Sequence, residues 1–233
     1  ISDEYPYVQG ELRFPSEFIN FYKVRTDQRP NNRVRYYNSS DRVVTFNPKY
    51  EAPEYITVAF EPPAVQPHKY GYINLKIDPA KAEHYGYNKD DVVIYTDAGD
   101  TAARMKLTVV GNIELYYPPV SDSEYAKKPH ILVSTEVVDF KKIESGDKVT
   151  EKIEIKNLGE ETLEIVDIMS NCGCLEMDLR RTEIKPGKSA KMKVTFDAEG
   201  RSGYQSNKIF IYANDPRHPM TTVKTLAQVG EEE

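Results

Sequence analysis

The sequence is poor in the residues and motifs that mark hydrolases, nucleotide-binding enzymes and metalloproteins. It has two cysteines and four histidines in 233 residues, and it lacks G-x-S-x-G, H-E-x-x-H and glycine-rich phosphate loops. No apolar run is long enough to cross a bilayer, and no segment keeps a helical period. The formal net charge is −6 with no basic stripe, which argues against nucleic acid and anionic lipid as partners. We expect no enzyme activity, no cofactor and no metal.

What the sequence does contain is typical of β structure. Its 17 Tyr, 15 Pro and 12 Gly accompany short Val-, Ile-, Phe- and Tyr-rich runs bounded by turn residues. In residues 189–197, Met192, Val194 and Phe196 alternate with Lys and Thr, as expected for a strand with one buried face. Turn signals recur about every ten residues, as in a Greek-key sandwich. The fold class expected is therefore all-β, with two tandem immunoglobulin-like β-sandwich domains.

The two halves of the chain repeat each other at a constant offset of 119, for example 131 − 12. Five pairs of residues share this offset: Leu12 and Ile131, Phe21 and Phe140, Asn38 and Asn157, Pro67 and Pro186, and Asp78 and Asp197. The offset becomes 117 at Ile94 and Ile211 (211 − 94), as expected where one loop differs in length. The repeat predicts two domains of the same fold.

The repeat also predicts where the domains begin and end. Domain 1 is expected at 11–114 and domain 2 at 129–230, joined by a stiff, polar, Pro-rich connector at 115–128. Residues 1–10 have the same character as this connector, which predicts a linker from a missing upstream domain; a frayed N-terminus is the alternative. Because residue 1 is Ile, we expect that the chain has been processed or trimmed and that any targeting signal is gone.

Five short motifs form a pattern in the second half. They are Asn157-Leu158-Gly159, Cys172-Gly173-Cys174, Pro186-Gly187, Phe196-Asp197 and Gly200-Arg201-Ser202-Gly203. With them, residues 131–229 resemble a bacterial family known as domain of unknown function 1573. The resemblance implies Hydin-like immunoglobulin-like modules and export, to the periplasm or the outer-membrane surface, commonly as a lipoprotein. It implies no activity, and Leu175 departs from the Thr that usually follows the second Cys.

Cys172 and Cys174 are the chemically unusual residues. At the offset of 119 they correspond to Pro53 and Tyr55, so the fold does not require them. In an extended strand their Cα atoms would be ~6.6 Å apart, near the upper limit for a disulfide, and Gly173 allows the chain to bend closer. The pair is interpreted first as an inert pair or a local disulfide clip, then as reactive redox thiols, and last as part of a soft-metal site. Two thiolates alone do not complete a tetrahedral zinc site.

Tyrosine is concentrated in the first half and is dense enough to line an exposed patch. The candidates for such a binding face are Tyr36, Tyr37, Tyr70, Tyr72, Tyr85 and Tyr87. Packing of the rings in strands is the alternative, and we favour it. Asp97 and Asp100 are interpreted as turn residues rather than calcium ligands.

The hypothesis that fits these features is a non-catalytic structural or interaction module, adhesive or scaffolding, of a secreted or envelope-anchored multi-domain bacterial protein. The expected partner is an envelope protein or a glycan, and membrane contact would come only through a removed N-terminal anchor. The alternative is a periplasmic protein that uses Cys172 and Cys174 for thiol redox chemistry or soft-metal handling. A glycosidase is disfavoured because no pair of carboxylates can be nominated.

Overall fold

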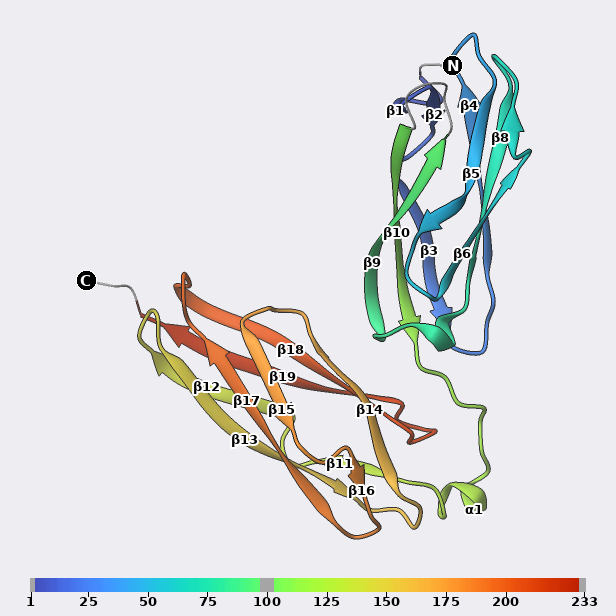
Figure 1. Cartoon of the computed structure of the whole chain (residues 1–233). Coiled ribbons are helices and arrows are strands. Elements are labelled where there is room, and N and C mark those ends of the chain that lie inside the picture. Colours follow the sequence, from blue (N-terminus) through green and yellow to red (C-terminus); the bar gives the residue numbers. More distant parts are fainter. Residues whose placement is uncertain (1–2, 97–102, 231–233) are drawn as a thin grey trace. The chain divides into compact units, whose positions relative to one another are not determined.

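A computed structural model describes residues 3–96 and 103–230 and divides the chain into two compact units, Ile1–Glu114 and Leu115–Glu233. Both units are built almost entirely of strands (Figure 1). The turn expected at 97–100 and the acidic end at 231–233 lie outside the described residues. None of the helices in the described part of the chain has the length and apolar character needed to span a bilayer.

Domain 1 is a sandwich of two sheets. One sheet has the order β1-β2-β4-β8-β6 and the other β3-β10-β9-β5-β7. The strands are β1 (Tyr7–Gln9), β2 (Leu12–Phe14), β3 (Phe18–Arg25), β4 (Asn31–Asn38), β5 (Val44–Glu51), β6 (Ile56–Glu61), β7 (Ala64–Val65), β8 (Tyr70–Ile77), β9 (Gly86–Thr96) and β10 (Ala103–Glu114), with a 3-10 turn η1 (Pro79–Lys81) after β8.

Domain 2 repeats this arrangement. Its sheets have the orders β11-β13-β17-β15 and β12-β19-β18-β14-β16. The elements are α1 (Asp122–Tyr125), β11 (Ile131–Val133), β12 (Val137–Ile143), β13 (Lys148–Asn157), β14 (Leu163–Ser170), β15 (Leu175–Leu179), β16 (Glu183–Ile184), β17 (Ser189–Asp197), β18 (Gly203–Ala213) and β19 (Met220–Val229). Strands β2 to β10 correspond in order to β11 to β19, so the all-β, tandem-sandwich fold class is confirmed.

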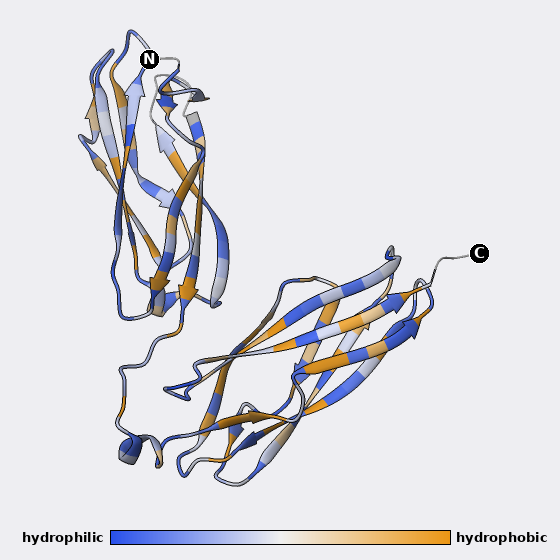
Figure 2. Ribbon diagram, turned by 180° about the vertical axis from the view of Figure 1, so that it is seen from behind, coloured by the Kyte–Doolittle hydropathy of each residue, from blue (hydrophilic) through white to orange (hydrophobic). Residues whose placement is uncertain are grey.

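The alternation predicted from the sequence places one face of each strand in a core. In β17, Met192, Val194 and Phe196 are buried while Lys191 and Lys193 are exposed. Apolar and polar segments alternate along the strands in the same way throughout both domains (Figure 2). The buried side chains of each domain form a core cluster between its own two sheets.

A buried asparagine fixes the same turn in both domains. Asn38 donates from Nδ2 to the carbonyls of Arg42 and Val65 and accepts the Ser40 N–H at Oδ1. Asn157 makes the equivalent bonds, donating to the Glu161 and Ile184 carbonyls and accepting the Gly159 N–H. All three partner positions differ by 119 between the domains (161 − 42, 184 − 65, 159 − 40). Asn38 and Asn157 are therefore equivalent buried turn residues.

In each domain the first long strand pairs in parallel with the last strand. Strand β3 pairs with β10, and β12 pairs with β19. Both pairings contain an irregularity next to a residue in the left-handed region, Tyr22 at φ 57° and Lys141 at φ 64°. The backbone N–H of Tyr22 donates to Asn20 Oδ1, and that of Lys141 donates to Asp139 Oδ1. In both cases the acceptor is the side chain two residues earlier. The same local device thus recurs at the 119 offset.

The end of the segment expected to be a connector packs within the second unit. Helix α1 begins at a capping box in which Ser121 and Glu124 satisfy each other's backbone N–H groups. The Tyr125 ring stacks on His130 at 4.1 Å between centroids, and the Arg217 guanidinium lies 4.2 Å from the Tyr125 centroid. The Tyr125 hydroxyl donates to the buried Asp215 carboxylate. These contacts make α1 part of the packed structure of domain 2.

Candidate functional site

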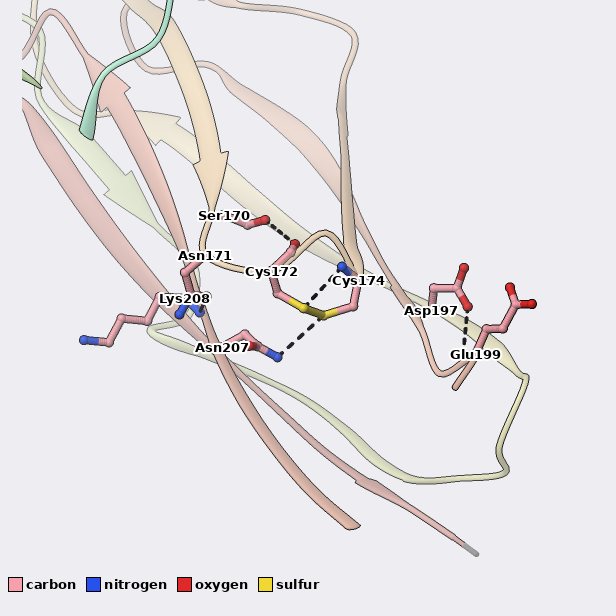
Figure 3. The surroundings of a disulfide bond; sticks show 8 residues. All are labelled: Ser170, Asn171, Cys172, Cys174, Asp197, Glu199, Asn207 and Lys208. Atoms are coloured by element: carbon pink, nitrogen blue, oxygen red, sulfur yellow. Dashed lines mark hydrogen bonds between the residues drawn. A yellow bond between two sulfur atoms is a disulfide. The ribbon is translucent and has the colours of Figure 1, made fainter. Parts of the chain in front are cut away.

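Cys172 and Cys174 form a disulfide in the loop between β14 and β15 (Figure 3). Their Cα atoms are 5.1 Å apart, closer than an extended strand allows, because the chain turns at this point. The turn is closed by the Leu175 N–H, which donates to the Cys172 carbonyl at 3.2 Å, and by the Asp197 N–H, which donates to the Cys174 carbonyl at 2.9 Å. The disulfide therefore links two residues across a hydrogen-bonded turn.

Domain 1 makes the same turn without cysteine. The Ile56 N–H donates to the Pro53 carbonyl at 2.9 Å, and the Asp78 N–H donates to the Tyr55 carbonyl at 2.8 Å. Each of these residues lies 119 before its counterpart in domain 2 (172 − 53, 174 − 55). The backbone conformation of the turn is thus specified by the fold, and the disulfide is an addition to it.

The two cysteines differ in exposure, and each sulfur has a neighbouring N–H donor. Cys172 is half-buried, whereas Cys174 is 4% exposed and belongs to the core cluster. The Cys174 backbone N–H donates to Cys172 Sγ at 3.2 Å, and Asn207 Nδ2 donates to Cys174 Sγ at 3.7 Å. Figure 3 shows that the Lys208 side chain points away from the disulfide, so these N–H groups are the polar neighbours of the sulfurs.

A metal site at the cysteine pair would need further ligands. In the part of the chain that the structure describes, no three His, Cys, Asp or Glu side chains are grouped so as to hold a metal ion. The two sulfurs are bonded to each other, and metals bind the thiolate rather than the disulfide form. A soft-metal site at this pair is therefore not supported by a complete ligand set.

The predicted tyrosine face is wrong for Tyr36 and Tyr37. Tyr36 is 0% exposed because its place in β4 directs it into the core, where its ring lies against those of Phe14 and Phe46. Tyr37 points to the other side of the strand but is 8% exposed, since other rings of domain 1 cover it. Neither ring offers a surface to a partner.

The other four tyrosines do not share one face either. Tyr85 packs against the core of domain 1, and Tyr87, although 70% exposed, lies on β9 in the other sheet. Tyr70 and Tyr72 are half-buried on β8, two residues apart and therefore on the same, outer side of the sheet. The predicted face is thus reduced to these two rings.

Two arginines of β4 cover those rings. The Arg33 guanidinium carbon lies 3.7 Å from the Tyr72 ring centroid, and that of Arg35 lies 3.8 Å from the Tyr70 centroid. Both arginines are exposed, and stacking on an aromatic face holds a guanidinium in place without using its N–H groups. We call Arg33, Arg35, Tyr70 and Tyr72 the Arg–Tyr layer. The tyrosine count alone did not point to the two arginines, although the alternation of β4 residues predicts that both lie on the outer side of the sheet.

Domain 2 has no such layer. At the offset of 119 the positions of Arg33, Arg35, Tyr70 and Tyr72 are occupied by Lys152, Glu154, Ser189 and Lys191. The two domains therefore share a fold but carry different candidate sites, the Arg–Tyr layer in domain 1 and the disulfide in domain 2.

Residues 131–229 match the family model described as "Protein of unknown function (DUF1573)". Domain 2 matches the DUF1573 family over these residues. A solved structure described as a protein of unknown function from Porphyromonas gingivalis W83 is similar over 94% of this chain and all of that chain, with 21% identity and a TM-score of 0.61. This similarity shows the two-domain fold. No curated protein matches the chain.

Two other solved structures are similar at a lower level. PapD-like domain 7 of human CEP192 covers 52% of this chain and 96% of its own, with 13% identity and a TM-score of 0.38. The YadV chaperone covers 92% of this chain and 99% of its own, with 14% identity and a TM-score of 0.32. At these scores neither supports a conclusion about function.

Most of the DUF1573 motifs quoted from the sequence are explained by folding. Asn157 is the buried turn residue, and a Cβ at Gly159 would lie 1.9 Å from the Lys128 carbonyl oxygen. Phe196 is in the core, and Gly187 and Gly203 have positive φ. Cys172-Gly173-Cys174 stands apart, because domain 1 builds the same turn with other residues.

Asp215 is a buried group whose role the sequence did not reveal. It lies in the sequence Asn214-Asp215-Pro216, which is typical of a turn, but it is 0% exposed and accepts hydrogen bonds from the Tyr125 hydroxyl and the Ile131 N–H. It also accepts hydrogen bonds from the backbone N–H groups of Arg217 and His218, as an aspartate in a turn commonly does. Burial and the neighbouring Asp215 charge raise the pKa of Tyr125 to about 12. With its acceptor sites filled, Asp215 holds α1 and β11 together.

Proposed function

We propose that the chain is a non-catalytic interaction module of an exported bacterial envelope protein, and that the Arg–Tyr layer of domain 1 binds an acidic envelope component. The observation that carries the proposal is the pair of exposed guanidinium groups stacked on Tyr70 and Tyr72. The match of domain 2 to the DUF1573 family and the immunoglobulin-like fold fit such a module. The envelope location rests on the family resemblance.

The charges of this face favour an anionic partner. Arg13 lies opposite Tyr37 in the β2–β4 pairing, so it extends the cationic row of Arg33 and Arg35 on the same side of the sheet. Within this row, Arg33 forms an ion pair with Glu61, with Arg33 Nη2 3.0 Å from Glu61 Oε2. Arg35 forms no ion pair within the described ranges. A protein of net charge −6 thus presents a local cationic surface.

The shape of the groups favours carboxylate or sulfate ligands. A guanidinium presents parallel N–H donors that match the two oxygens of such a group, and stacking reduces the conformational freedom lost on binding. Acidic glycans carry these groups at regular intervals along a polymer, and acidic proteins carry them in clusters. Both are envelope components, and the experiment separates them.

The test is a glycan array of acidic and neutral polysaccharides, run in parallel with a pull-down of envelope proteins by the full chain. Arg33→Ala with Arg35→Ala should weaken binding about tenfold or more, since charge-assisted hydrogen bonds contribute about 1.5–3 kcal/mol each. The matched control is Lys152→Ala with Lys191→Ala, which removes the same charge from the corresponding face of domain 2 and should leave binding unchanged. Equal weakening by both double variants, or no acidic partner in either assay, would overturn the proposal.

A further inference from the structure

The disulfide of domain 2 is unexplained by the fold and independent of the Arg–Tyr layer. The same hydrogen-bonded turn forms in domain 1 around Pro53 and Tyr55. A ring closed over three residues also removes little chain entropy from the unfolded state, far less than a bridge across a long loop. Stabilisation of the turn is therefore a weak reason for the pair.

A second difference between the domains lies beside the sulfurs. In domain 1 the Tyr55 hydroxyl donates to the carboxylate of Asp90. The corresponding positions in domain 2 are Cys174 (174 − 55 is 119) and Asn207 (207 − 90 is 117, the offset of this strand). Where domain 1 has an acceptor, domain 2 has an amide donor whose Nδ2 is 3.7 Å from Cys174 Sγ. A carboxylate here would repel a thiolate, whereas an amide N–H stabilises one.

We propose that the Cys172–Cys174 disulfide is a thiol–disulfide exchange site that accepts electrons from a protein with two cysteine thiols, and that Cys172 Sγ is the atom attacked. Cys172 is half-buried and Cys174 is in the core, so an incoming thiolate reaches the first sulfur and not the second. A side-chain atom added at Gly173 would meet nothing within 4 Å, which leaves open space for a partner's backbone over the loop.

The exchange balances in two steps. A partner thiolate attacks Cys172 Sγ, forming a mixed disulfide and breaking the Cys172–Cys174 bond, with Cys174 leaving as a thiolate toward Asn207 Nδ2. The partner's second thiolate then attacks its own sulfur in the mixed disulfide, and Cys172 leaves as a thiolate held by the Cys174 N–H, which lies 3.2 Å from Cys172 Sγ. Two electrons pass to this chain, its two thiolates take up protons from solvent, and the partner gains a disulfide.

The first test is reduction of the folded full chain by dithiothreitol, followed by alkylation and mass spectrometry, with circular dichroism to monitor the fold. We expect reduction without loss of β structure. Asn207→Asp, which installs the residue of domain 1, should slow the reduction about tenfold by opposing the Cys174 leaving group. Reduction only when the protein unfolds, or an unchanged rate in a folded Asn207→Asp variant, would overturn the proposal in favour of a local clip.

The second test separates the two sulfurs. Cys174→Ser leaves Cys172 as the free thiol and Cys172→Ser leaves Cys174, and their reaction with Ellman's reagent reports the access of each. The Cys172 thiol should react about tenfold faster or more, since it is the exposed one. The free Cys172 thiolate of Cys174→Ser should also attack envelope proteins in their disulfide form, which is the product of the exchange, and hold them as mixed disulfides as the partner's other sulfur leaves as a thiolate; dithiothreitol then releases them. Equal reactivity of the two single variants would contradict the assigned order of attack, and absence of trapped proteins would contradict the protein partner.

Discussion

Replacing Asn157 with aspartate tests whether the buried asparagine acts as a donor. Asn157 Nδ2 donates to the carbonyls of Glu161 at 2.7 Å and Ile184 at 2.9 Å, and Oδ1 accepts the Gly159 N–H at 2.9 Å. Aspartate has the same shape but puts an oxygen where the amide nitrogen lies. As a carboxylate, it would place negative charge against two carbonyl oxygens in a site with no solvent exposure.

The cost of Asn157→Asp can be worked from these contacts. The variant folds only when the introduced carboxyl group is protonated, which at pH 7 costs about 4 kcal/mol, at 1.36 kcal/mol for each of about three pH units above its unfolded pKa. A protonated carboxyl can donate one hydrogen bond, so one carbonyl loses its partner at about 1–3 kcal/mol. The sum is about 5–7 kcal/mol, comparable to the stability of a whole domain.

The sign of the pH dependence follows from linkage. Burial against carbonyls raises the folded-state pKa of the introduced carboxyl group, so the folded state binds a proton that the unfolded state releases above about pH 4. The loss of stability is therefore smallest at pH 4 and grows by about 3–4 kcal/mol as pH rises to 7. Urea unfolding followed by circular dichroism at the two pH values measures it.

Two comparison variants sharpen this measurement. Asn157→Leu removes the same hydrogen bonds without a titrating group, so its deficit should stay constant between pH 4 and pH 7. Asn38→Asp should reproduce the pH-dependent loss in domain 1, because Asn38 donates to the Arg42 and Val65 carbonyls in the same way. A pH-independent loss in Asn157→Asp, or one below about 1 kcal/mol at pH 7, would refute the assigned donor role.

Three further predictions concern domain 2. Gly159→Ala should lower the free energy of unfolding in urea by about 2–3 kcal/mol, because its Cβ would meet the Lys128 backbone, whereas Gly173→Ala should change it by less than about 0.5 kcal/mol. The pKa of Tyr125 is raised to about 12 in the folded state, so the stabilisation that its protonated hydroxyl contributes is complete below pH 10 and is lost as the pH rises from 10 to 12. The melting temperature of Tyr125→Phe should therefore fall less over this pH range than that of the unchanged protein. Cys172→Ser with Cys174→Ser should keep a β-rich circular dichroism spectrum and lose roughly 1.6 kcal/mol from closure of a three-residue ring, plus about 1–3 kcal/mol for a hydroxyl at the buried position 174; an unfolded double variant would contradict the equivalence of the two turns.

The sequence predicted the fold because its signals are local and repeated. Period-2 alternation and turn residues specify each strand, and the 119 offset carries Asn38 onto Asn157 without any knowledge of the structure. The resemblance to DUF1573 is confirmed over residues 131–229 by the family model. These features depend on neighbours within a few residues, or on a comparison of the chain with itself.

The side-chain surroundings could not be predicted in the same way. Tyr36 and Tyr37 are consecutive, so alternation predicts that one of them faces outward, but it does not show that rings from other strands cover the outer one. Tyr125 meets Asp215 across 90 residues of sequence, and no local pattern links them. The Asn207 amide likewise reaches Cys174 from a strand 33 residues later. Sequence patterns specify which residues are strand or turn, while these contacts depend on tertiary packing.

The parallel pairing of first and last strands has a mechanical consequence. Strand β12 is the first long strand of domain 2 and β19 is its last strand, and the two run side by side in the same direction from Val137 opposite Lys224 to Ile143 opposite Val229. A force applied between the start of β12 and the end of β19 therefore pulls these strands past each other, and their hydrogen bonds must break together rather than one at a time. Domain 1 has the same arrangement in β3 and β10. The parallel pair is thus loaded in shear in both domains when the ends of these two strands are pulled apart.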